Sequence, residues 1–365
     1  PSAGDRWRRR ARLLAGYARG MPVWATDWAV PAFARRVREL VQQWQPDVVQ
    51  IEHHVMGQYV PALRGCPAPR ILTEHEPGTP AAREQYHAAR GIGRVVRGMD
   101  LLAWRWFERA VLREMQAVVA FTERDRRDLR DVHSGVPIAR ISVGAPIPPR
   151  PLDPLGRPPP SVLFAGNYAH PPNVGAALRL GQTIFPRVRA RCPDARLFLV
   201  GDQPTAAIRR LASESVIVTG RVPDVTPYLD RAAVVAAPLS TGGGMRVKVL
   251  EAIAAGKALV ASQRAVAGLD LAPGEEFLRA ETDVEFADAI TGLLAGPPLR
   301  TALGRRARRW ATDHLGWDEP VRAYERLYGA LTERGGNPPA LDGCRVAVRG
   351  VRDDGGGRGS ATWSS

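Results

Sequence analysis

Cysteines and long apolar runs are scarce in this chain of 365 residues, and each scarcity excludes a class of protein. The three cysteines, Cys66, Cys192 and Cys344, lie far apart and form no CxxC spacing, which argues against a disulfide scaffold and against a zinc framework. A reducing cytoplasm fits this cysteine usage best. The chain contains no run of about 18 apolar residues, so we expect no membrane-spanning helix.

Lysine is scarce as well, although the formal net charge is +14. Only Lys248 and Lys257 are lysines, and all other basic residues are arginines. A general bias toward arginine explains most of this charge, while a basic face for anionic lipid or nucleotide phosphates stays open. The sequence shows no spacing typical of RNA- or DNA-binding motifs, so we expect no nucleic-acid partner.

Eight prolines lie within residues 146–160, a density that excludes helix and central strand and predicts a semi-rigid linker. The linker divides the chain into an expected first domain at 1–145 and a second at 161–332. Residues 333–365 are rich in glycine without apolar periodicity, which predicts a disordered tail.

Apolar runs alternate with helical patterns after the linker, which predicts an α/β domain with a doubly wound parallel sheet. The expected strands are 161–165, 196–200, 216–219, 233–237, 258–261 and 276–278. The expected helices are 174–191, 205–212, 225–231, 245–255, 303–314 and 319–332.

The same alternation before the linker is thinner. Expected strands are 48–51, 70–73, 117–121 and 141–143, a long helix covers 94–114, and residues 1–44 are predicted to be helical. We find no opening strand, glycine loop and helix of the kind that begins a doubly wound domain. Because the chain also starts at Pro1, we expect the first domain to be truncated.

A glycine loop between a strand and a helix is the most informative segment. Gly242, Gly243 and Gly244 follow the strand that ends near Pro238, and such a loop lets backbone N–H groups and a helix N-terminus approach a phosphate. Arg246 and Lys248 are expected in the first helical turn, where positive charge is unfavourable unless an anion binds there. The alternative is that the glycines only turn the chain.

Glu251 lies one turn further along the same helix, where a carboxylate can accept hydrogen bonds from the two hydroxyls of a ribose. An ion pair between Glu251 and Lys248 is the alternative. A second glycine turn holds Gly166 and Asn167 at the carboxyl edge of the sheet, and we expect Asn173 to be the N-cap of the next helix.

Two segments of the first half follow strands and are therefore expected at a carboxyl edge. They contain Glu52, His53 and His54, and Glu74 and His75. Histidines and carboxylates in a cleft can position a hydroxyl nucleophile or polarise a leaving group, and His75 is our candidate catalytic residue. Buried structural histidines are the alternative. Thr122 is expected to cap the helix that follows the third strand.

Four motifs in this order resemble the second domain of GT-B glycosyltransferases of the family 4 type. They are FAGNYAHPPN at 164–173, LFLVG at 197–201, VTGRVPDV at 218–225 and GGGMRVKVLEAIAAGKALVAS at 242–262. The resemblance spans about residues 47–330. It implies two Rossmann-like domains facing a cleft, a nucleotide-diphosphate sugar held mainly by the second domain, and retention of anomeric configuration without an essential metal or cofactor.

The resemblance also assigns roles to residues. Glu251 matches the ribose-binding glutamate that ends the family's E-x7-E motif, Arg246 and Lys248 match the diphosphate cations, and His75 matches a cleft histidine. Gly166 and Asn167 would line the donor side. Gly243 stands where the motif's first glutamate is expected, so the backbone of 242–244 would contact the sugar instead.

The sequence therefore predicts an enzyme that transfers a sugar to a hydroxyl acceptor, a glycan or a lipid-linked glycan, in the biosynthesis of polysaccharides or glycolipids. Peripheral contact with the inner face of a membrane is compatible with this interpretation. A GT-B-fold epimerase of sugar nucleotides and a non-catalytic nucleotide-sugar-binding fragment remain as alternatives.

Overall fold

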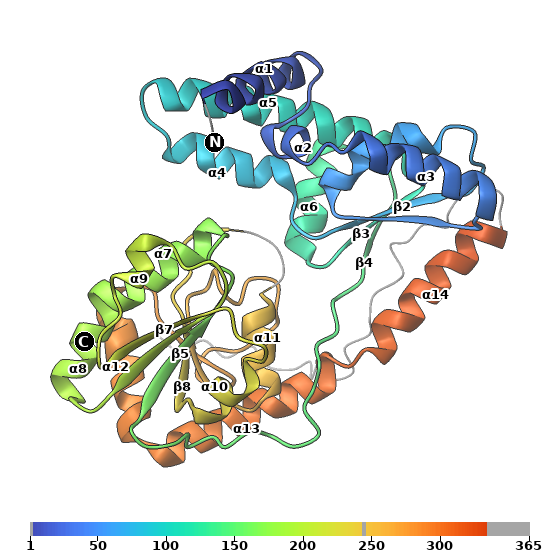
Figure 1. The fold of residues 1–365 in the computed structure, drawn as a ribbon. Coiled ribbons are helices and arrows are strands. Elements are labelled where there is room, and N and C mark those ends of the chain that lie inside the picture. Colours follow the sequence, from blue (N-terminus) through green and yellow to red (C-terminus); the bar gives the residue numbers. More distant parts are fainter. Residues whose placement is uncertain (1–2, 243–245, 334–365) are drawn as a thin grey trace, which may run out of the picture.

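Two parallel β-sheets, each flanked by helices, organise the chain in a computed structural model that describes residues 3–242 and 246–333 (Figure 1). The first sheet has four strands in the order β1-β2-β3-β4, and the second has six in the order β10-β9-β8-β5-β6-β7. The second sheet is therefore wound in both directions from β5, as expected. In the first sheet the described strands lie side by side in the order in which they occur in the sequence.

The first sheet is built from short, mostly apolar strands. They are β1 (Val49–Glu52), β2 (Arg70–Glu74), β3 (Ala117–Ala120) and β4 (Ile138–Arg140). Its helices are α1 (Ala3–Ala18), α2 (Val23–Asp27), α3 (Pro31–Trp44), η1 (His54–Leu63), α4 (Gly78–Ala88), α5 (Ile92–Arg113) and α6 (Glu123–Val132). Thr122 caps α6, as predicted, because its side chain accepts a hydrogen bond from Asp125 N at 3.0 Å.

The predicted fourth strand is wrong by three residues. Val118 N donates to Pro137 O at 2.9 Å, which fixes the ladder at 138–140, and Ile141 N makes the last bond to Ala120. The apolar pattern continues through both segments, so the sequence does not locate the strand within it.

The second sheet agrees with the predicted strands except at its edge, where β10 covers 278–279. Its strands are β5 (Ser161–Ala165), β6 (Arg196–Val200), β7 (Val216–Gly220), β8 (Val234–Ala237), β9 (Ala258–Ala261) and β10 (Leu278–Arg279). Its helices are α7 (Pro171–Arg179), the π-helical η2 (Leu180–Ile184), α8 (Phe185–Arg191), α9 (Ala206–Arg209), α10 (Thr226–Arg231), α11 (Val247–Ala254), α12 (Asp283–Ala295) and α13 (Pro297–His314).

Several helices differ from the prediction. Helix α12 was not predicted, and α13 begins at Pro297, six residues before the expected start at 303. The starts of α7 and α11 differ as well. Helix α7 begins at Pro171 with His170 as N-cap, so Asn173 lies inside its first turn and does not cap it. Proline suits the first turn because its missing N–H has no intrahelical partner there. Helix α11 begins at Val247, so Arg246 is its N-cap and only Lys248 lies in the first turn.

The last described helix, α14 (Asp318–Glu333), returns to the first sheet. Figure 1 shows it beside β4, although β4 is almost 180 residues earlier in the sequence. Ala323, Leu327 and Leu331 join a buried cluster with residues of the first sheet that include Ile71 and Val119. The chain thus covers one face of its first sheet with its own C-terminal helix.

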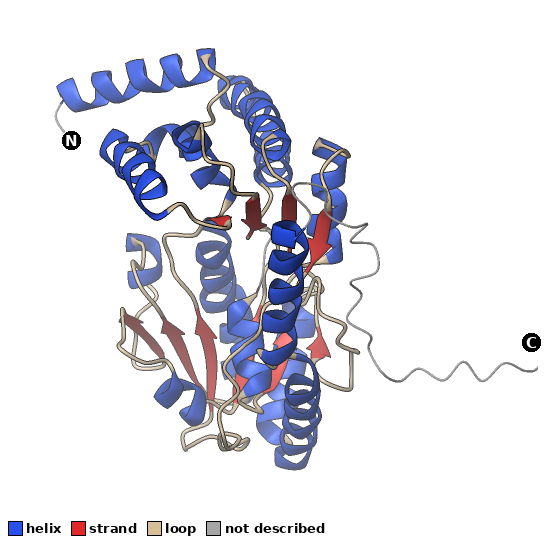
Figure 2. Ribbon diagram, turned by 90° about the vertical axis from the view of Figure 1, so that its right-hand side faces the viewer, coloured by secondary structure: helices blue, strands red, loops and turns tan. Residues whose placement is uncertain are grey.

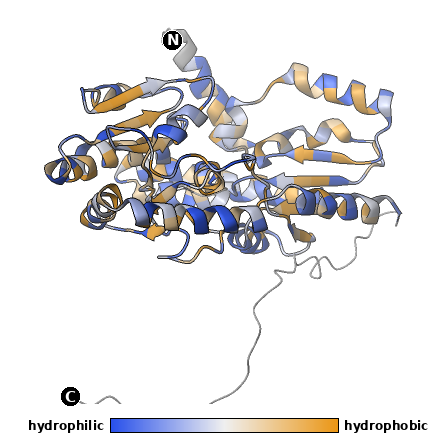
Figure 3. Cartoon of the chain, turned by 90° about the horizontal axis from the view of Figure 1, so that it is seen from below, coloured by the Kyte–Doolittle hydropathy of each residue, from blue (hydrophilic) through white to orange (hydrophobic). Residues whose placement is uncertain are grey.

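Residues 141–160 form neither helix nor strand. Arg308 of α13 links this segment to α11, because it donates to the carbonyl oxygen of Pro148 and to that of Ala254 in α11. The strands of both sheets are mostly apolar along their lengths (Figure 3), and helices cover the sheets on both faces (Figure 2). The predicted tail at 333–365 lies almost entirely outside the described residues.

Candidate functional site

A cleft of about 900 Å³ lies between the carboxyl edges of the two sheets. Six of the predicted site residues line it: Gly166, Asn167, Arg246, Lys248 and Glu251 from the second half, and His75 from the first. Gly242 lies beside the cleft, close to Pro172 and to the Arg246 guanidinium. Gly243 and Gly244 lie outside the described residues.

The N-terminus of α11 presents Arg246 to the cleft. This side chain is 8% exposed and donates from Nη2 to the carbonyl oxygen of Gly242 at 2.6 Å. Gly242 has a φ of 94°, a left-handed conformation that side chains rarely adopt, so the loop requires glycine here. Burial lowers the pKa of the Arg246 guanidinium, although arginine remains charged at neutral pH.

Lys248 is held by two neighbours. Its ammonium group donates to Asn173 Oδ1 and lies 4.9 Å from the centroid of the Phe164 ring. Burial, with a further contribution from the positive charge of Arg246, lowers the pKa of Lys248 to about 8. The side chain therefore carries its charge at neutral pH and loses it in mildly alkaline solution.

Gly166 permits the close approach of these groups. A Cβ atom at this position would lie 3.0 Å from Asn173 Cγ and 3.2 Å from Lys248 Nζ. Any larger residue would therefore displace the ammonium group. The predicted glycine turn serves the site by leaving room for Lys248.

Glu251 lies on the same side of α11 and lines the same cleft. Burial raises the pKa of its carboxyl group, and the positive charge of Lys248 opposes that shift. In the described structure the Lys248 ammonium group donates a hydrogen bond to Asn173. This contact, and not the alternative ion pair with Glu251, positions the group.

His75 and Glu52 form the opposite wall. His75 Nε2 lies 2.8 Å from Glu52 Oε2, and this hydrogen bond raises the pKa of His75 and lowers that of Glu52. His53 stacks on His75 with ring centroids 5.5 Å apart. The φ of His53 is 76°, which is unusual for a residue with a side chain and holds its ring at the cleft.

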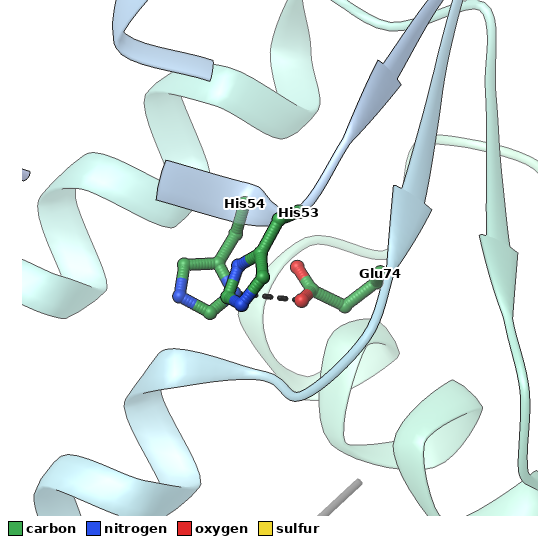
Figure 4. Close-up of side chains that lie close together, drawn as sticks. All are labelled: His53, His54 and Glu74. Carbon is green, nitrogen blue, oxygen red and sulfur yellow. Dashed lines mark hydrogen bonds and ion pairs between the residues drawn. The ribbon is translucent and has the colours of Figure 1, made fainter. Parts of the chain in front are cut away.

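A buried pair lies behind this wall. Figure 4 shows His53 and His54 close to Glu74, and His54 Nδ1 lies 2.7 Å from Glu74 Oε1. Burial lowers the pKa of His54 to about 4, so its ring is neutral at pH 7, and burial raises the pKa of the Glu74 carboxyl well above its usual range. Ligand atoms of these three residues lie within 4.8 Å of one another, a grouping that could hold a metal ion. The hydrogen bond between His54 and Glu74 already engages one ligand atom of each of these two residues.

The two halves also touch beside Gly242. Glu84 of α4 accepts a hydrogen bond from Arg264 Nη1 at 2.8 Å, and Gly242 N lies 3.4 Å from its other oxygen. The same Arg264 nitrogen lies 3.3 Å from Gly242 O. A carboxylate of the first half therefore contacts the loop that leads to Arg246.

Sequence reasoning missed Glu84 and Arg264, and it misassigned Asn173 as a cap. No local pattern marks Glu84 or Arg264, because each gains its role from a contact between distant segments. Asn173 did carry a signal, since it belongs to the FAGNYAHPPN motif. Tyr328 of α14, which donates to Gln50 at the cleft, was also not predicted.

Two parallel sheets that face a cleft at their carboxyl edges, with cations at the N-terminus of a helix, define the GT-B class of nucleotide-sugar enzymes. The family described as Glycosyltransferase Family 4 matches residues 2–145, and the one described as Glycosyl transferases group 1 matches residues 159–296. The chain belongs to the GT-B glycosyltransferases of the family 4 type and is an enzyme of that class.

Individual relatives agree. A phosphatidyl-myo-inositol mannosyltransferase of Mycolicibacterium smegmatis is 28% identical over 82% of this chain and 76% of its own length. The sucrose-phosphate synthase of Thermosynechococcus elongatus has a similar structure, with a TM-score of 0.68 and 20% identity over 83% of this chain and 78% of that one. TarM of S. aureus, in a complex with UDP, has a TM-score of 0.62 and 13% identity over 80% of this chain and 58% of its own.

Among the described residues, no helix is both long and apolar enough to cross a membrane.

Proposed function

We propose that this glycosyltransferase moves a sugar from a nucleotide-diphosphate donor to a hydroxyl acceptor with retention of anomeric configuration. One observation carries the proposal. The cleft brings Arg246, Lys248 and Glu251 of the second half opposite His75 of the first. An anion-binding helix N-terminus thus faces a polar wall across a space large enough for a sugar nucleotide.

The second half is the donor side in this proposal. The Arg246 guanidinium and the Lys248 ammonium neutralise the diphosphate, and the N–H groups at the start of α11 add to the same field. Glu251 accepts hydrogen bonds from the ribose hydroxyls, one turn further along the helix. Gly166 and Asn167 line the donor side next to Lys248.

Catalysis follows from the same charges. Negative charge develops on the diphosphate as the bond to the anomeric carbon breaks, and fixed cations in a buried site stabilise that charge. A complex of TarM contains UDP, which supports a nucleoside diphosphate in a GT-B cleft of this kind. His75, with its pKa raised by Glu52, would hydrogen-bond the sugar or the acceptor hydroxyl from the opposite wall.

The acceptor is proposed to be a glycan or a lipid-linked glycan, used in the biosynthesis of polysaccharides or glycolipids at the inner face of a membrane. The name of the mycobacterial relative, which acts on a phosphatidylinositol, supports a lipid acceptor. Exposed apolar residues on the first half, considered below, point the same way.

Labelled UDP- and GDP-sugars, incubated with and without a lipid acceptor, test the proposal. We expect labelled product only when donor and acceptor are both present, and NMR of the product should show the anomeric configuration of the donor. Isomerised sugar nucleotide without acceptor would support the epimerase alternative and contradict transfer. Nucleotide binding without any product would contradict catalysis by this chain.

A further inference from the structure

Helix α5 carries a row of large apolar side chains that no part of the described structure covers. Ile92 is 82% exposed and Trp106 is 70% exposed, although apolar residues of this size usually lie in the core. The row consists of Ile92, Val95, Val96, Met99, Leu102 and Trp106. At 3.6 residues per turn, these six lie within an arc of about 120° on one face of the helix. A contiguous exposed apolar patch of this kind marks an interaction surface.

Another side of the same helix already packs against the core, so the exposed row is not the core-facing side of α5. Trp104, Phe107, Val111 and Leu112 are buried in the cluster beneath α5. Helix α5 therefore has two apolar faces, and packing inside the chain uses only one of them. The second face needs a partner outside the described structure.

Helix α1 extends this surface. Trp7 and Leu14, seven residues apart and on one face of α1, are both largely exposed. The turn after α1 meets α5, because a Cβ atom on Gly20 would lie 3.4 Å from Trp106 Cβ. Figures 1 and 2 both place α1 and α5 on the side of the first half that is remote from the six-stranded sheet.

The charged side chains of α5 next to the row are basic. Arg105 and Arg109 are exposed and lie beside the row, whereas the exposed Arg94 and Arg97 lie on the far side of the helix. The helix has only two acidic residues, and both are buried and engaged. Asp100 accepts from Val23 N at 2.9 Å, and Glu108 accepts from Gly78 N and Thr79 N. The exposed surface of α5 thus combines apolar side chains with arginines and presents no carboxylate.

We propose that α5, with the exposed face of α1, docks the enzyme onto the surface of a bilayer that contains anionic lipids. An amphipathic helix with aromatic and aliphatic residues on one face and arginines beside them lies in the membrane interface, where its cations meet lipid phosphates. Tryptophan is favoured at that depth because its ring is amphipathic. A second copy of the chain fits less well, because a symmetric contact would bring two rows of arginine together.

The role of this surface depends on the proposed function, because docking would bring the cleft to a lipid-linked acceptor. Its physical test is independent of transfer. Flotation of the full chain with vesicles of phosphatidylcholine, with and without phosphatidylglycerol, measures binding directly. We expect binding that requires phosphatidylglycerol and weakens as salt screens the charges.

Substitutions test the apolar residues and the arginines of the surface separately. Leu102→Ser combined with Trp106→Ser should lower the vesicle partition coefficient by about tenfold or more, because both apolar groups would leave the interface. The matched control is Val284→Ser with Leu299→Ser, two exposed apolar residues of the second half, and it should bind as the wild type does. Arg105→Gln with Arg109→Gln should weaken binding to anionic vesicles, whereas Arg209→Gln with Arg305→Gln should not.

Equal binding by the wild type and the Leu102/Trp106 variant would overturn the proposal, as would the same loss in the control. A dimer in sedimentation without vesicles, dissociated by the Trp106 substitution, would assign the face to a second copy and also overturn it. Transfer to a water-soluble acceptor, measured in the same preparations, distinguishes the two proposals. Transfer without vesicle binding refutes only the docking surface, and vesicle binding without transfer refutes only the proposed function.

Discussion

Lys248 shows how the environment of a single residue controls the charge of the proposed donor site. Its ammonium group is partly buried beside a second cation and donates a hydrogen bond to Asn173. Both burial and the charge of Arg246 favour the neutral amine, so the pKa falls to about 8. A bound diphosphate would have the opposite effect and stabilise the ammonium form.

This predicts that donor affinity depends on pH. Because the free enzyme loses the Lys248 proton above about pH 8, the dissociation constant of UDP-sugar should rise by up to about tenfold per pH unit above that value. The diphosphate diester of the donor does not itself titrate there. Isothermal titration calorimetry between pH 7 and pH 9 measures the effect.

Lys248→Arg is the control, because a guanidinium keeps its charge throughout this range. Its donor affinity should be nearly independent of pH, whatever its absolute value. A wild-type affinity that stays constant up to pH 9 would show that Lys248 does not contact the diphosphate.

Several site residues could be predicted from sequence because their motifs are local. Gly166, Arg246, Lys248 and Glu251 lie within two short segments whose order along the chain fixes their place at the carboxyl edge of one sheet. Glu84 could not be predicted, because its contact with Arg264 joins residues 180 positions apart. The burial of His54 and Glu74 likewise depends on helices whose packing is not visible in the sequence.

At the scale of single elements, α4 illustrates a cap supplied from another helix. The residue before it, Pro77, provides no side-chain cap, and the N–H groups of Gly78 and Thr79 instead donate to Glu108 of α5. Because this site is buried, water could not replace the Glu108 carboxylate as the acceptor for these backbone N–H groups.

Glu108→Ala should therefore destabilise the protein by about 1–3 kcal/mol, the cost of leaving buried donors unsatisfied. Urea denaturation followed by circular dichroism measures this loss. Glu108→Gln keeps a carbonyl acceptor at the same place and should cost less than the alanine variant. A glutamine variant as unstable as the alanine variant would contradict the capping role.

Element boundaries were predictable where turn chemistry is specific. Thr122 was identified as a cap from its spacing to Asp125, and the structure confirms it. The start of α7 was not, because Pro171 and Pro172 were assigned to the loop although proline is favoured in a first helical turn.

At the scale of the whole molecule, α14 links the end of the chain to its first sheet. Leu327 is buried there with Ile71 and Val119, whereas Glu325 on the same helix is exposed. Two helical patterns near the end of the chain were predictable from the sequence. The packing of the second of these helices, α14, against strands more than 200 residues earlier was not, because periodicity gives an apolar face without its partner.

Leu327→Ala should lower the free energy of unfolding of the first half by about 2–5 kcal/mol, because it removes a buried side chain and leaves a cavity. Hydrogen exchange of the β2 and β3 amides should report this as faster exchange, with the β6 amides less affected. Glu325→Ala should leave exchange unchanged. Unaltered protection of β3 in the Leu327 variant would mean that α14 does not stabilise the first sheet.

The fold class and the role of the second half as the proposed donor side followed from the order of four motifs, while the cleft depends on how both halves are placed. The account as a whole depends on cations at the N-terminus of α11 acting on a diphosphate. Arg305 on α13 offers a matched control, because it is exposed and does not line the cleft.

The most direct test is the turnover number for sugar transfer at saturating donor in the wild type, Arg246→Ala and Arg305→Ala. Removing a preorganised charge from the departing diphosphate should lower turnover by about 10²-fold or more in Arg246→Ala, and Arg305→Ala should match the wild type. An Arg246→Ala enzyme with wild-type turnover would contradict the central claim.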